Sequence, residues 1–116
     1  GEVIPGAYAC DTLAVTVAQD AEGPVFTLQY QGMPSFAVKA SFAEPRRFTA
    51  VSSVPEAPSN LYLAACGWEN GVLHLTARAT DAPFYMKTAL RFTGSELEVD
   101  AFGVGLPGGK YVLKKR

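Results

Sequence analysis

The sequence is poor in the residues on which metal sites and most catalytic sites depend. It has one histidine, His74, and two cysteines, Cys10 and Cys66, in 116 residues. No Cys-x-x-Cys or His-x-x-x-His spacing occurs, so the usual zinc ligand sets cannot be assembled from neighbouring residues. We therefore expect no metal site and no cofactor, and we expect His74 to point outward beside Thr76 in a structural role.

Two cysteines are also too few for a framework of disulfides. A single Cys10–Cys66 bridge would close a long loop and stabilise the fold by roughly 4 kcal/mol on the chain-entropy model. The alternative is a pair of small buried thiols. Neither alternative is excluded, and cysteine usage leaves the cellular compartment open.

An excess of charge of one sign is missing as well. Ten Lys and Arg side chains face eleven Asp and Glu side chains, for a formal net charge of -1. This balance provides no field to steer the protein toward nucleic acid or an anionic membrane, and we predict neither partner. No apolar run approaches the roughly 20 residues of a membrane-spanning helix. The first residues lack the pattern of a signal peptide.

Helical periodicity is absent, whereas short alternating stretches recur about every ten residues with turn residues between them. This pattern predicts a single all-β domain over residues 1–116. Mostly sequential hairpins favour an antiparallel up-and-down β-barrel of about eight to ten short strands over a Greek-key sandwich. Such a barrel is nearly filled by side chains or holds one small ligand. Its predicted inward aromatic residues are Phe26, Phe36, Phe48, Phe84 and Phe92.

The clearest local signal lies between Gly67 and Val99. Asn70-Gly71 separates two apolar stretches, and this pair is the preferred sequence of a type I′ hairpin turn. After the turn, Leu73, Leu75, Ala77 and Ala79 alternate with polar residues. Further along, Met86, Leu90 and Phe92 and then Leu97, Val99 and Ala101 are assigned to the buried face. Before the turn, Leu61, Leu63 and Ala65 are assigned to one face of a strand. Three consecutive strands with period two predict a sheet with one buried and one exposed face.

Two groups of residues were candidates for a functional site. Glu96, Glu98 and Asp100 share one strand face, but we interpret them as a solvated surface that cross-strand Lys87 or Arg91 neutralises in part. No nucleophile with an adjacent base is apparent, so no catalytic residue is predicted. Trp68, Tyr62 and Phe84 are the candidate ligand-binding residues. The alternative for Trp68 is a structural ring that covers the mouth of the barrel.

A family resemblance rests on the order of aromatic, apolar and turn residues. The residues that carry it are Gly6 and Tyr8; Leu13 and Val15; Phe26 and Leu28; Trp68, Gly71, Leu73 and Leu75; Ala82-Pro83-Phe84; and Leu90, Phe92, Gly94, Leu97 and Val99. This succession resembles the lipocalin-like domain that follows the catalytic domain in many serine hydrolases related to β-lactamases and penicillin-binding proteins. This order of residues matches the family over the second half of the chain, and the first half agrees with the family in the number of strands.

The resemblance implies a non-catalytic C-terminal accessory domain, cut from a longer bacterial protein, that packs against an upstream catalytic domain and shapes substrate access. No Ser-x-x-Lys occurs, and Lys87-Thr88-Ala89 departs from the Lys-Thr-Gly of these enzymes in its last residue. The parent protein would be either exported or cytoplasmic. The alternative function is a free-standing lipocalin-like protein that binds a small apolar ligand inside the barrel.

Overall fold

The fold is taken from a computed structural model of the chain. It describes residues 2–19, 21, 23–32, 36–40, 48–52, 61–79, 83, 85–103 and 108–116, with the backbone alone at 36–40, 48–52, 61–64, 66 and 79. Every secondary-structure element of these residues is a β-strand, as predicted. Among them, no helix has the length and hydropathy needed to cross a bilayer.

The described residues form ten strands in one antiparallel sheet. In chain order they are β1 (Gly6–Ala9), β2 (Leu13–Gln19), β3 (Pro24–Tyr30), β4 (Phe36–Ala40), β5 (Phe48–Ser52), β6 (Leu61–Glu69), β7 (Val72–Ala79), β8 (Tyr85–Phe92), β9 (Glu96–Gly103) and β10 (Gly109–Lys115). Hydrogen-bonded neighbours are also neighbours in sequence, except that β1 pairs with β10. This is the connectivity of an up-and-down meander rolled into a barrel, which confirms the predicted fold class.

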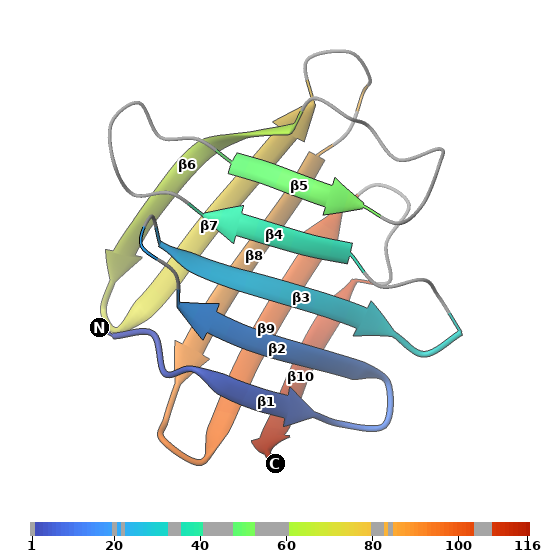
Figure 1. The fold of residues 1–116 in the computed structure, drawn as a ribbon, viewed down its shortest axis with the longest axis vertical. Coiled ribbons are helices and arrows are strands. Elements are labelled where there is room, and N and C mark those ends of the chain that lie inside the picture. The colour runs from blue at the N-terminus through green and yellow to red at the C-terminus, as the bar shows by residue number, and fades with distance from the viewer. Residues whose placement is uncertain are drawn as a thin grey trace.

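The sheet folds over on itself in two layers. In Figure 1, β1 to β5 lie in front and β6 to β10 lie behind, and the strands of the two layers cross steeply. The β1–β10 ladder joins the layers on one side, with Tyr8 opposite Lys115. On the other side β5 and β6 are the two ends of the hydrogen-bonded order, and their Cα atoms approach within 8 Å. The layers therefore enclose an interior that side chains from both must fill.

The predicted turn between β6 and β7 is present. Asn70 has φ 52° and Gly71 has φ 77°, and the flanking residues Glu69 and Val72 pair across the ladder. Positive φ at both central residues defines the type I′ turn, which matches the right-handed twist of the strands that it joins. The predicted turn at Gly94 and Ser95 is present as well, and Gly94 has φ 95°.

Alternation along the strands builds the core. Buried and outer positions follow each other through β2, β3, β8 and β9 with period two. The buried apolar side chains are Tyr8, Leu13, Val15, Val17, Phe26, Leu28, Tyr30, Leu73, Leu75, Ala77, Met86, Leu90, Leu97, Val99, Ala101 and Leu113. Each large one contributes roughly 1.5–3 kcal/mol of hydrophobic free energy. Both layers supply members, so the core holds the barrel together across its width.

The predicted alternation in β6 is wrong after Leu63. The β6–β7 register shifts between Leu63 and Ala65, so that Leu63 pairs with Ala77 but Ala65 pairs with Thr76. The extra residue at the β-bulge reverses the faces of the strand beyond it. Ala65 is consequently exposed, whereas the period-two pattern placed it on the same face as Leu61 and Leu63.

Several other predictions lie outside the described side chains. The inward positions of Phe36, Phe48 and Phe84 belong to this group, as does Cys66. Cys10 is half-buried and carries a free thiol, so of the two alternatives for the cysteines the structure has the free thiol.

Candidate functional site

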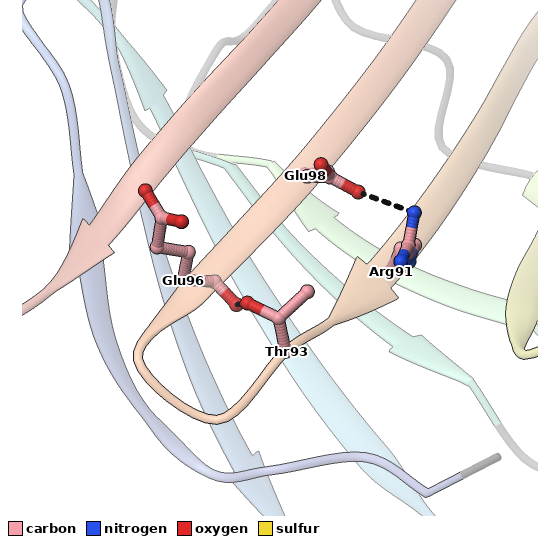
Figure 2. Close-up of polar contacts among 4 residues, drawn as sticks. All are labelled: Arg91, Thr93, Glu96 and Glu98. Atoms are coloured by element: carbon pink, nitrogen blue, oxygen red, sulfur yellow. Dashed lines mark hydrogen bonds and ion pairs between the residues drawn. The ribbon is translucent and has the colours of Figure 1, made fainter.

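The outer face of β8, β9 and β10 carries paired and unpaired charges. The guanidinium of Arg91 reaches across from β8 to Glu98 on β9, with 3.3 Å between Nη1 and Oε2, as Figure 2 shows. The pair stands directly opposite in the ladder register. The turn that sets this register is closed by Thr93, whose backbone N–H and side-chain hydroxyl both donate to the carbonyl of Glu96, at 3.0 and 3.3 Å.

The row of carboxylates does not converge on a point. Glu96, Glu98 and Asp100 follow one another along β9, and their partners in the β10 register are Lys114, Val112 and Lys110 respectively. Among the described residues, no group of three or more His, Cys, Asp or Glu side chains is arranged to hold a metal ion. The structure agrees with the interpretation of this row as a solvated face with cationic neighbours, of which Arg91 contacts Glu98.

A shallow groove of about 380 Å³, called here the outer groove, lies over these strands. Its lining includes Ala89, Arg91, Glu98, Asp100, Lys110 and Val112. Small apolar side chains form part of its floor, and positively and negatively charged side chains surround them. Val112 is 54% exposed, which is high for a large apolar side chain in a strand.

An aromatic cluster lies on the same outer face. Phe102 on β9 is 64% exposed, and its ring meets the ring of Tyr85 edge-on, with centroids 6.1 Å apart. The Arg78 guanidinium lies 5.0 Å from the centroid of the Tyr85 ring, in the geometry of a cation–π contact. Phe102 lies two residues beyond Asp100 along β9, so the aromatic cluster adjoins the row of carboxylates on this strand.

The three candidate ligand-binding residues are not brought together as one described site. Trp68 is half-buried, stands opposite Leu73 in the ladder and packs against the core. This position agrees with the structural alternative for Trp68. Tyr62 stands opposite Arg78 in the register of β6 and β7. Phe84 lies outside the described residues.

His74 lies on the outer face, as predicted, and it is half-buried. Its opposite residues are Gly67 on β6 and Ala89 on β8. Neither neighbour carries an acid, a thiol or a hydroxyl with which an imidazole could form a catalytic pair.

Inside the barrel, a cavity of about 20 Å³ remains between the layers. Val15, Phe26 and Leu28 line it from β2 and β3, and Leu75, Met86, Thr88 and Leu90 line it from β7 and β8. Thr88 is the one polar residue among these, and it is 5% exposed. The cavity is therefore apolar apart from one hydroxyl group.

Two buried tyrosines have perturbed hydroxyl groups. Burial raises the pKa of Tyr8, whose hydroxyl donates to the carbonyl of Ile4 at 2.7 Å. Burial also raises the pKa of Tyr30, and the neighbouring Tyr111 adds to this effect because two phenolates would repel each other. The rings of Tyr30 and Tyr111 pack edge-on at 6.2 Å. Both tyrosines stay neutral and structural near neutral pH.

Two residues of interest were not singled out from the sequence. Phe102 is separated from Glu96, Glu98 and Asp100 by even numbers of residues along the strand, so alternation alone places this large ring on the outer face. Thr88 lies two residues from both Met86 and Leu90 along the strand, so alternation places its hydroxyl in the core. In both cases the signal was a residue whose polarity contradicts its position in the strand.

Comparison of the chain with protein-family models, with curated proteins and with solved structures finds no match.

Proposed function

We propose that the chain is a non-catalytic accessory domain of a β-lactamase-related serine hydrolase, which packs against the catalytic domain through the outer face of β8 to β10 and shapes access to its active site. The observation that carries the proposal is the exposure of two large apolar side chains, Phe102 at 64% and Val112 at 54%, on the same outer face. Apolar side chains rimmed by polar groups are typical of protein contact surfaces.

The rest of this face supports the same role. The outer groove lies beside Val112, and Arg91, Glu98, Asp100 and Lys110 surround it with both signs of charge. Mixed charges around an apolar centre favour one partner and one orientation over others. Among the described residues, Asp100 and Lys110 have no ion-pair partner, so both are free to contact another surface.

Binding to the catalytic domain tests the proposal. The serine hydrolase domain encoded with this chain is produced separately, and its affinity for the chain is measured by calorimetry. We expect Phe102→Ser and Val112→Ser each to weaken binding by roughly tenfold or more, because central apolar contacts contribute the most to affinity. Thr16→Ala, on the exposed outer face of β2, is the matched control and should leave affinity unchanged. Equal affinity for all variants, or the lack of a serine hydrolase domain encoded with this chain, contradicts the proposal.

The proposal that the chain has no catalytic activity of its own is tested separately. The pure chain is incubated with a chromogenic β-lactam and with an activated ester, and product formation is followed against buffer. We expect the two rates to be equal, since the nucleophile is placed on the partner domain. Saturable turnover by the chain alone would refute this part.

A further inference from the structure

One edge of β6 has no partner strand among the described residues. β6 ends the hydrogen-bonded order, and its approach to β5 within 8 Å forms no ladder. Figure 1 shows β6 as the outermost strand of the rear layer, with its C-terminal half leading away from β5. Outside the β6–β7 ladder, no backbone hydrogen bond between described residues reaches this strand. Its outer N–H and C=O groups can therefore pair with a strand from outside the barrel.

The two-residue turn after β6 determines which backbone groups face this edge. The residues that flank such a turn, here Glu69 and Val72, exchange both of their hydrogen bonds, and bonded and non-bonded pairs then alternate along the ladder. Gly67 is consequently bonded to β7. Trp68 and Cys66 belong to non-bonded pairs, so their N–H and C=O groups point away from β7 and toward the free edge.

The edge lacks the features that keep the edges of most sheets from pairing. Natural edges are commonly blocked by Lys, by Pro or by an inward-pointing charge. From Leu61 to Trp68, β6 has no charged residue and no proline. Ala65 and Gly67 are exposed, and a Cβ atom added at Gly67 would meet no atom of the described residues within 4 Å. Beyond the bulge, the edge is therefore regular and open to a second strand.

The edge is complementary to itself. An antiparallel pair of identical strands has a two-fold axis, so both copies use the same surface. With the axis at Gly67, Cys66 stands opposite Trp68 of the second copy. All of the edge-facing groups of these two residues are then paired, because each such pair exchanges both N–H···O bonds. The two Glu69 residues lie roughly 13 Å apart at 3.3 Å per residue, so their like charges do not meet.

We propose that β6 pairs with β6 of a second copy of this chain, in antiparallel register about Gly67, and that the protein is a reversible dimer. Self-pairing covers both edges at once, whereas an unrelated peptide added here would present a new open edge of its own. The contact involves few residues of each strand, so we expect a dissociation constant on the order of 0.1 mM. β7 separates β6 from the outer face of β8 to β10, so this proposal and the proposed function can fail independently.

Sedimentation equilibrium measures the association. Between about 10 μM and about 1 mM chain, the average mass should rise from that of one chain toward that of two. Gly67→Lys puts two ammonium groups beside the axis and should raise the dissociation constant about tenfold or more. Thr16→Lys adds the same charge to the exposed outer face of β2 and should associate like the unmodified chain. The mass of one chain at every concentration, or equal dissociation constants for the two variants, overturns the proposal.

Amide hydrogen exchange followed by NMR tests the register in the unmodified chain, so it does not depend on a variant that folds. The N–H groups of Cys66 and Trp68 face solvent in a single chain and should become protected as the concentration rises. The N–H of Gly67 is bonded to β7 in both states and should change little, so it is the control within the same strand. Exchange at Cys66 and Trp68 that does not depend on concentration overturns the proposal.

Discussion

The type I′ turn at Asn70 and Gly71 allows a sharp test, because the chain offers a matched pair of glycines around it. Gly71 has φ 77°, whereas Gly67, four residues earlier in β6, is outside the positive-φ region. A Cβ atom added at either glycine would meet no atom within 4 Å. Gly71→Ala and Gly67→Ala therefore differ in backbone conformation and not in steric fit.

The expected free energies follow from two opposing effects. An L-residue in the left-handed region costs about 1–2 kcal/mol. Replacing Gly by Ala also restricts the unfolded chain, which stabilises the fold by about 0.4–1 kcal/mol where the conformation is compatible. Gly71→Ala should therefore lower the free energy of unfolding by roughly 1 kcal/mol, and Gly67→Ala should leave it unchanged or raise it slightly.

Urea unfolding followed by tryptophan fluorescence measures both variants, and Trp68 is the single reporter. With a slope near 2 kcal/mol per molar urea, the Gly71→Ala midpoint should fall by about 0.5 M relative to the unmodified chain. The two variants should differ from each other by about 1–2 kcal/mol. If Gly67→Ala loses as much stability as Gly71→Ala, or if neither loses any, the assignment of strain to this turn is wrong.

Three further outcomes are expected. Leu97→Ala removes a side chain that is 0% exposed and should cost about 2–5 kcal/mol in urea unfolding, whereas the exposed Val112→Ala should stay within about 0.5 kcal/mol. A double-mutant cycle on Arg91 and Glu98, whose side chains are 59% and 45% exposed, should give a coupling of about 0.2–1 kcal/mol that largely disappears in 1 M salt; a coupling that survives salt would contradict a surface pair. Because the pKa of Tyr30 in the fold lies above its ordinary value of 10.0, its contribution to stability is complete below pH 10 and is lost as the pH rises through the folded pKa. Thermal unfolding should therefore show a smaller loss of stability above pH 10 for Tyr30→Phe than for the unmodified chain, and identical losses would refute this.

The parts of the fold that depend on near neighbours could be predicted from sequence. The turn at Asn70 and Gly71 follows from the φ angles that these two residues tolerate. The inward positions of Leu97 and Val99 follow from period two, because a strand places alternate side chains on opposite faces. The Arg91–Glu98 pair was predictable to the extent that a short turn determines which residues of two strands stand opposite each other.

The bulge in β6 could not be predicted in the same way. Alanine is found readily on either face of a sheet, so neither Ala64 nor Ala65 marks the residue at which the alternation reverses. The reversal becomes visible only where the strand pairs with β7, since Trp68 and Leu73 share the inward side while Ala65 pairs with Thr76. The alternation of side chains predicts which face of a strand each residue occupies. It predicts an inserted residue only when that residue strongly prefers either the buried or the exposed face.

The candidate site was harder to predict than the fold. Trp68 was a candidate ligand-binding residue with a structural role as the alternative, and it packs against the core. Thr88 and Phe102 have ordinary strand-forming side chains, and they differ from their surroundings only in which face they occupy. Their significance depends on three-dimensional facts, namely a buried hydroxyl beside a cavity and an aromatic ring with 64% of its surface exposed.

The β1–β10 ladder has a consequence for how the protein forms in time. Each of the ten strands pairs with the strand just before or just after it, and such hairpins form within microseconds. The second edge of β1, in contrast, waits for β10, the strand farthest from it in sequence, and closing this long loop has a large entropic cost that is met before the new contacts stabilise it. During synthesis, one edge of β1 therefore remains open to unwanted pairing with other chains until β10 has been added.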